Sequence, residues 1–129
     1  MKYLAIAVVV VALLTACQES LEDRCEREAR EFTRKHCPTL INKDIALDSM
    51  VFDKQSRTVS YCYTLRGEID DTALIRRSDS RELMLQQLKN ATSLKLYKDA
   101  GFSFRYTYHS SKVKGTQLFE ATFHQSDYN

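Results

Sequence analysis

Cysteines and histidines are the residues of this sequence with the greatest capacity for nucleophilic, redox or metal chemistry. The chain has four cysteines and three histidines among its 129 residues. His109 and His124 are expected at opposite ends of one β-hairpin, about 27 Å apart at ~3.4 Å per residue, which is too far to share a metal ion. His36 is expected at the end of a helix, where a cation is stabilised by the helix dipole. We therefore predict no metal site.

Three cysteines, Cys25, Cys37 and Cys62, can in principle pair or react. Cys25 and Cys37 are expected on one helix, about 18 Å apart, whereas the Cα atoms of bridged cysteines lie within roughly 7 Å of each other. Cys37 and Cys62 are therefore the better candidates for a disulfide, although strand alternation places Cys62 on the face away from the helices. The alternative is an enzyme that uses an unpaired Cys37 or Cys62 thiol, which quantitative thiol labelling of the folded protein would detect.

Short motifs that usually carry catalysis are missing. The sequence contains no C-x-x-C, G-x-S-x-G or H-E-x-x-H, and its three glycines form no phosphate-binding loop. The connector 67–78 carries Glu68, Asp70 and Asp71, but their spacing does not follow the alternating pattern of a calcium loop, and we expect them in a solvated loop. These absences favour a protein that is not an enzyme and has no cofactor.

Tyrosines are concentrated on two predicted strands, at Tyr61, Tyr63, Tyr106 and Tyr108. Tyrosine serves both protein cores and binding surfaces. Packing beneath the helices is the simpler interpretation of this set. Alternatively, because a helix covers only ~10 Å of sheet width, the ends of these strands stay open and bind a protein or a glycan.

Hydrophobic periodicity predicts the elements that must position these residues. Ser20 is suited to cap a helix that ends at Pro38, and residues 45–53 and 58–66 read as a β-hairpin. A second helix is expected from near Ser80 to Gly101, which suits a left-handed C-cap.

An extra short strand containing Leu94 and Leu96 is the alternative to the last part of that helix. The most regular alternation lies in the C-terminal region, where a register opposing Phe102 to Phe123, Phe104 to Ala121 and Tyr106 to Phe119 places the aromatic rings on one face. We therefore predict an α+β two-layer sandwich with two helices on a four-stranded antiparallel sheet, in the order α-β-β-α-β-β.

The fourth cysteine ends an apolar segment at the N-terminus. Lys2 precedes an apolar run from Tyr3 to Leu14, which is typical of a secretory signal and shorter than the roughly 20 residues of a transmembrane helix. The residues Leu14-Thr15-Ala16-Cys17 resemble the lipobox of bacterial lipoproteins. This resemblance implies cleavage before Cys17 and lipid attachment to it, so that the chain is anchored without spanning the membrane. Gln18, in place of aspartate, implies the outer membrane.

Residues 1–16 are thus expected to form the signal peptide, and residues 17–129 a single domain on a short tether. The net charge of +2 does not indicate a nucleic-acid partner. In general style the mature domain looks like small uncharacterised lipoproteins of Bacteroidetes-type envelopes. We expect a non-catalytic binding or assembly module whose partner is an envelope protein or a glycan, and a binder of a soluble ligand is a third hypothesis.

Overall fold

The computed structural model describes residues 19–77 and 79–129, so the signal peptide and the lipidation predicted at Cys17 lie outside the described residues. Five strands form one sheet in the spatial order β1-β2-β3-β4-β5. Their bounds are β1 Thr39–Asn42, β2 Ile45–Asp53, β3 Thr58–Leu65, β4 Ser103–Ser110 and β5 Gln117–Phe123. The α-helices are α2 Leu21–His36, α3 Thr72–Arg77, α4 Ser80–Asn90, α5 Lys95–Asp99 and α6 Gln125–Tyr128, and the 3-10 turns are η1 Gly67–Ile69 and η2 Thr92–Leu94.

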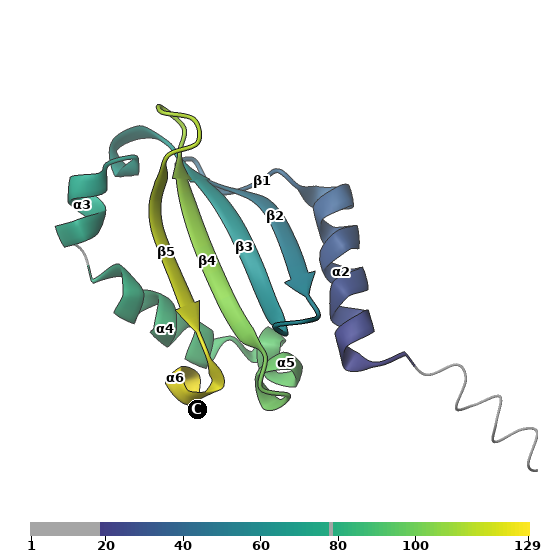
Figure 1. The fold of residues 1–129 in the computed structure, drawn as a ribbon. Helices are drawn as coiled ribbons and strands as arrows, with labels where there is room; N and C mark the ends of the chain where they lie inside the picture. Colours follow the sequence, from purple (N-terminus) through teal and green to yellow (C-terminus); the bar gives the residue numbers. More distant parts are fainter. Residues whose placement is uncertain (1–18, 78) are drawn as a thin grey trace, which may run out of the picture.

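Helices flank the sheet on two sides. Helix α2 lies beside β2, α3 and α4 lie beside β5, and α5 and α6 lie together at one end of the strands (Figure 1). Among the described helices, none combines the length and the hydrophobicity needed to span a lipid bilayer.

Helix α2 begins and ends where the sequence predicts. The Ser20 hydroxyl accepts a hydrogen bond from the Asp23 backbone N–H at 3.0 Å, so Ser20 caps the helix as expected. Cys25 and Ala29 lie on one stripe of α2 and are buried in the core. The opposite side is charged and exposed, with pairs such as Arg24–Glu28 at 2.9 Å.

Both predicted hairpins form, and the second one has a shifted register. Phe104 pairs with Phe123 and Tyr106 pairs with Ala121, so β5 is displaced by two residues from the expected alignment. Because side chains alternate with a period of two, a shift of two residues leaves every aromatic ring on the predicted face.

The prediction of four antiparallel strands is wrong in two respects. Thr39–Asn42 forms an additional edge strand, β1, immediately after Pro38, in a stretch too short to show a period. In addition, β3 and β4 are parallel, with Tyr61 opposite Tyr106 and Tyr63 opposite Tyr108. The long connection from Leu65 to Ser103 crosses from the end of β3 back to the end of the sheet where β3 begins, and parallel neighbouring strands require a crossover of this kind. The fold class is therefore α+β with a mixed five-stranded sheet.

The long second helix predicted from Ser80 to Gly101 is interrupted. Helix α4 ends at Asn90, and η2 and α5 follow instead of the alternative strand at Leu94 and Leu96. The predicted role of Gly101 is confirmed, since its φ is +81° and its N–H donates to Lys98 C=O at 3.0 Å.

One face of the sheet carries the core. Phe102, Phe104, Phe123 and Leu88 are completely buried, and Cys25 and Ala29 of α2 pack against the same cluster. The core on this face is thus covered by residues of α2, α4 and α5.

Thr33 of α2 forms hydrogen bonds with the unpaired edge of β2. Strand β1 pairs only with Ile45 to Leu47, which leaves the edge of β2 unpaired from there on. The Thr33 hydroxyl donates to Met50 C=O at 2.8 Å and accepts from Met50 N–H at 2.9 Å. One side chain therefore satisfies two backbone groups that would otherwise be available to another strand.

Replacing this hydroxyl tests its role. Thr33→Val keeps the shape of the side chain but removes both hydrogen bonds to Met50, and we expect it to lower the free energy of unfolding by about 1–3 kcal/mol. Urea denaturation followed by circular dichroism measures this. Thr92→Val, at an exposed threonine, is the matched control and should change little. Equal stability of the two variants would show that α2 does not depend on this contact.

Candidate functional site

An apolar groove lies on the core face of the sheet, at the C-terminal ends of β3 and β4. Its volume is about 660 Å³. The floor is made by inward-facing residues of four neighbouring strands, Ile45, Leu65, Tyr63, Tyr108 and Phe119. Tyr63 is paired with Tyr108, and Tyr108 with Phe119, so these three form a continuous row across the sheet.

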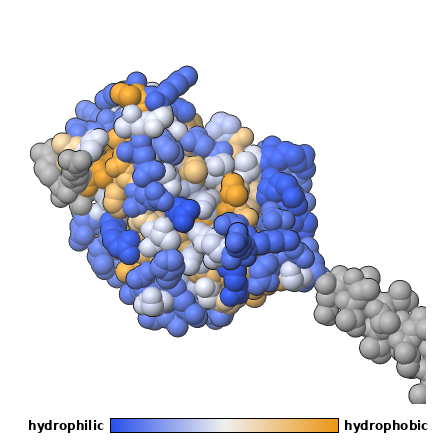
Figure 2. Space-filling view, in the orientation of Figure 1, coloured by the Kyte–Doolittle hydropathy of each residue, from blue (hydrophilic) through white to orange (hydrophobic). Residues whose placement is uncertain are grey.

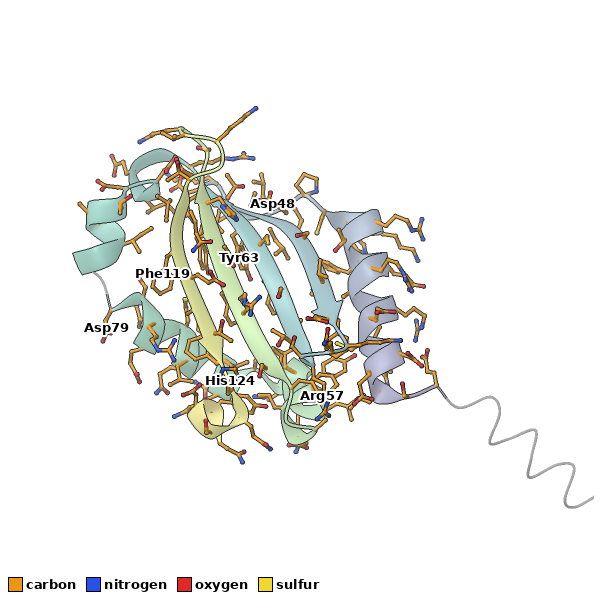
Figure 3. The ribbon with its side chains drawn as sticks, viewed as in Figure 1. Asp48, Arg57, Tyr63, Asp79, Phe119 and His124 are labelled. Atoms are coloured by element: carbon orange, nitrogen blue, oxygen red, sulfur yellow. The ribbon has the colours of Figure 1, made fainter. Side chains whose placement is uncertain are left out.

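The walls of the groove are formed at the two edges of the sheet, by β1 at one edge and by α3 and α4 beside β5 at the other. The wall residues are aliphatic or uncharged polar: Ile41 and Asn42 of β1, Ile69 of η1, Leu74 and Ile75 of α3, and Ser80, Leu83, Met84 and Gln87 of α4. Phe119 lies on the side of β5 that faces α3 and α4 (Figure 3). Apolar residues gather on this side of the molecular surface (Figure 2).

Among the side chains that the structure describes, none that lines the groove is charged, although 28% of the residues in the chain are charged. Leu83 is 62% exposed and Ile41 is 57% exposed. An apolar surface that is open to solvent and whose described side chains are uncharged is typical of a protein interaction site.

The four tyrosines predicted as a binding surface are brought together as two stacked pairs. The ring centroids of Tyr63 and Tyr108 are 4.7 Å apart, and those of Tyr61 and Tyr106 are 5.1 Å apart, with interplanar angles of 11° and 7°. They differ in position, because Tyr61 is buried in the core whereas Tyr63 and Tyr108 are partly exposed on the groove floor. The set therefore divides between the core and the groove.

The phenols of Tyr63, Tyr106 and Tyr108 stay neutral. Burial raises the pKa of Tyr106 to about 12 and also raises the pKa values of Tyr63 and Tyr108. At physiological pH these side chains can therefore donate and accept hydrogen bonds but carry no charge.

Helix α3 forms a wall of the groove because two aspartates hold its first turn. Asp71 Oδ1 accepts from the backbone N–H groups of Ala73 and Leu74, at 2.8 and 3.3 Å, and so caps α3. Asp70 Oδ2 accepts from the backbone N–H groups of Ser111 and Lys112, at 3.0 and 2.9 Å. This second contact attaches α3 to the β4–β5 loop and places it over the sheet.

Asp70 is a correction to the sequence prediction of a solvated acidic loop. Its side chain is buried, at 7% exposure, while Glu68 and Asp71 are exposed as expected. Burial alone would raise the pKa of Asp70, but hydrogen bonds from Ser110, Ser111 and the Lys112 backbone hold that pKa below its ordinary value of 3.8.

The predicted disulfide is not present, since Cys25, Cys37 and Cys62 are all free thiols. Cys37 packs against the core cluster, whereas Cys62 alternates with Tyr61 and Tyr63 and faces the other side of the sheet. Burial raises the pKa of Cys25 to about 11 and raises that of Cys37, so neither is an activated thiolate.

The histidines lie apart from one another. His124 Nδ1 is 2.8 Å from Ser103 Oγ, near the start of α6, and His109 is at the other end of the hairpin. Among residues 19–77 and 79–129, no cluster of three or more His, Cys, Asp or Glu side chains could hold a metal ion.

Sequence reasoning missed the residues that form the walls. Ile41 lies in a stretch for which the sequence predicts no element, and Leu74 and Ile75 lie in the predicted connector 67–78. The apolar stretch Ala73-Leu74-Ile75 followed by Leu83 and Met84 was the available signal, because it places aliphatic residues on a segment otherwise read as polar.

The geometry can be compared with known proteins. Residues 20–119 match a domain of unknown function, DUF8479. The chain belongs to the DUF8479 family. This match contains every residue of the groove. No curated protein matches the chain.

Solved structures share the fold of this DUF8479 domain. A candidate secreted protein from Pseudomonas aeruginosa aligns with a TM-score of 0.69 and 14% identity, covering 87% of this chain and 100% of its own. The type II secretion system pilotins EpsS of Vibrio vulnificus and AspS of Vibrio cholerae align with TM-scores of 0.59 and 0.56, each at 12% identity. These alignments cover 84% and 83% of this chain and 92% and 91% of the pilotins.

At such identities the likeness shows a common fold. These neighbours come from Pseudomonas and Vibrio, so they do not support the resemblance to Bacteroidetes-type lipoproteins.

The anchoring of the α3 wall gives a prediction for acid stability. A carboxylate whose pKa is lowered on folding stabilises the protein fully above its unfolded pKa, and this contribution is lost as the pH falls through the folded value. Asp70→Asn should therefore reduce stability at pH 7 by on the order of 1–2 kcal/mol and flatten the decline below about pH 4. Urea unfolding between about pH 2 and 7 measures both effects.

Glu68→Gln is the control, because this neighbouring carboxylate is exposed. If Asp70→Asn and the unmodified protein lost stability in parallel on acidification, Asp70 would not be the anchor of α3.

Proposed function

We propose that this protein is a lipid-anchored envelope protein whose domain binds one amphipathic helix of an envelope partner in the groove between the sheet and helices α3 and α4. The observation that carries the proposal is the partly exposed apolar groove, whose described lining side chains are all uncharged. We propose a non-catalytic role, and burial that raises the pKa values of the Cys25 and Cys37 thiols is in keeping with it.

The position of the groove favours a helix as its occupant. The floor is the face of the sheet, so a bound segment cannot extend the strands by backbone pairing. A segment lying on an apolar face must satisfy its own N–H and C=O groups, and a helix does so internally. Helices α2, α4 and α5 cover the rest of this face, and one more helix over the groove would complete the layer.

The apolar and uncharged side chains that the structure describes along the groove indicate which side of that helix is bound. A helix with apolar residues at i, i+3, i+4 and i+7 can bury that stripe in the groove without burying a charge. A charged side chain placed there would lose its hydration without gaining an oppositely charged partner in the described lining. The polar side of the same helix would remain in solvent.

The proposed anchor and the groove lie at opposite ends of α2. Cys17 precedes the first residue of α2, Leu21, by four positions, whereas Ile41 of the groove follows the last, His36, by five. A 16-residue helix is about 24 Å long. A lipid on Cys17 would thus hold the domain close to the membrane with the groove displaced from the anchor, where a second envelope protein can reach it.

The fold likeness to pilotins supports the same assignment. Those proteins belong to type II secretion systems. By analogy, we infer that the partner is a component of a secretion or assembly system in the outer membrane.

Site-specific photocrosslinking in intact cells tests the proposal. A photoreactive amino acid replaces Leu83 in the groove of the tagged full-length chain, and Leu96, exposed on α5, is the matched control. We expect Leu83 to crosslink to one envelope protein, within an amphipathic helical segment identified by mass spectrometry, and Leu96 to give no such product.

The anchor is tested in the same cells. Cys17→Ala should release the protein from the membrane fraction and abolish the Leu83 product, because the lipid supplies the local concentration of the partners. Equal products from both positions, or products with lipid alone, would contradict the proposed site.

A further inference from the structure

A small polar cavity opens beside the apolar groove. Its volume is about 170 Å³, and Tyr63, Met84, Gln87 and Tyr108 line both spaces. Tyr106 contributes a third phenol, while Leu88 and Ala91 close the bottom of the cavity. Three tyrosines and one glutamine therefore line one small space beside a mainly apolar groove.

These hydroxyls are available to a ligand. No hydrogen bond joins the hydroxyl of Tyr63, Tyr106 or Tyr108 to another residue in the part of the chain that the structure describes. Yet within that part every fully buried polar side-chain atom has a partner. The three hydroxyls are therefore accessible to solvent, and because the three tyrosines line the cavity, solvent or a bound group there can satisfy them.

The chemistry of the cavity selects its guest. A purely apolar side chain would displace solvent and leave the hydroxyls unsatisfied. A charged side chain would lose its hydration without meeting an opposite charge in the described lining, because none of the described residues that line either space is charged. An amide or a hydroxyl avoids both costs, since phenols and the Gln87 amide donate as well as accept.

We infer that the cavity bounded by Tyr63, Tyr106, Tyr108 and Gln87 is a specificity subsite that receives one asparagine, glutamine, serine or threonine side chain from the apolar face of the bound helix. This inference rests on the proposed function, because it concerns a helix held in the adjoining groove. It adds that the partner is recognised by one uncharged polar residue within an apolar stripe.

Peptide display on the immobilised mature domain tests the subsite. The library consists of amphipathic helical peptides in which every position of the apolar face is randomised. We expect the selected peptides to keep aliphatic residues at all but one of these positions and to carry an amide or a hydroxyl at the remaining one.

Three variants locate the contact. Tyr63→Phe and Tyr108→Phe keep the stacked rings but remove the hydroxyls, and each should weaken a selected peptide by about fivefold. Both should leave the same peptide with leucine at the polar position unaffected. Tyr61→Phe is the control, because the Tyr61 ring stacks on Tyr63 and Tyr106 but lines neither the groove nor the cavity.

The outcomes separate the two proposals. Selection of wholly apolar peptides, or equal binding by the Tyr63→Phe, Tyr108→Phe and Tyr61→Phe variants, would overturn the subsite and leave the groove in place. Failure to select any peptide that Leu83→Glu releases would overturn the groove and the subsite together.

Discussion

Parallel pairing of β3 with β4 is the constraint on which the rest of the structure depends. Because Tyr61 pairs with Tyr106 and Tyr63 with Tyr108, the chain leaves the sheet at Leu65 and must return to its other end at Ser103. The connection between them supplies η1, α3, α4, η2 and α5 in a single crossing. The same pairing brings the tyrosines face to face in two stacked pairs, which contribute about 0.5–1.5 kcal/mol each beyond their buried area.

The crossing covers the core face unevenly, and this creates the site. Leu88 of α4 and Phe102, which follows α5, are completely buried in the core beneath these helices. Nearer the C-terminal ends of β3 and β4, α3 lies beside β5, and Asp70 next to it is hydrogen-bonded to the β4–β5 loop. Tyr63 and Tyr108 are therefore covered on one side and open on the other. Among the stacked tyrosines, Tyr61 is therefore part of the core, whereas Tyr63 and Tyr108 form the floor of the groove.

Local signals predicted much of this fold. The Ser20 cap, both hairpins and the turn at Gly101 depend on neighbouring residues and could be predicted from spacing alone. The groove could not, because Ile41 and Leu74 come from stretches of four and six residues, too short to show a period. Burial of Asp70 likewise depends on Ser111, 41 positions further along the chain. The tyrosines were identified as candidates, but only the parallel register shows which of them line the groove.

Accessibility of the groove in the native envelope tests the central claim most directly. Leu83→Cys and Leu96→Cys place thiols at two exposed leucines, one in the groove and one on α5. Their labelling rates with a membrane-impermeant maleimide are compared between isolated envelopes, opened to both faces, and the purified domain, with mass spectrometry to identify the labelled residue. A groove occupied by a partner helix predicts that Leu83→Cys is protected only in envelopes, while Leu96→Cys reacts equally in both. Equal reaction of Leu83→Cys in both preparations would contradict the account.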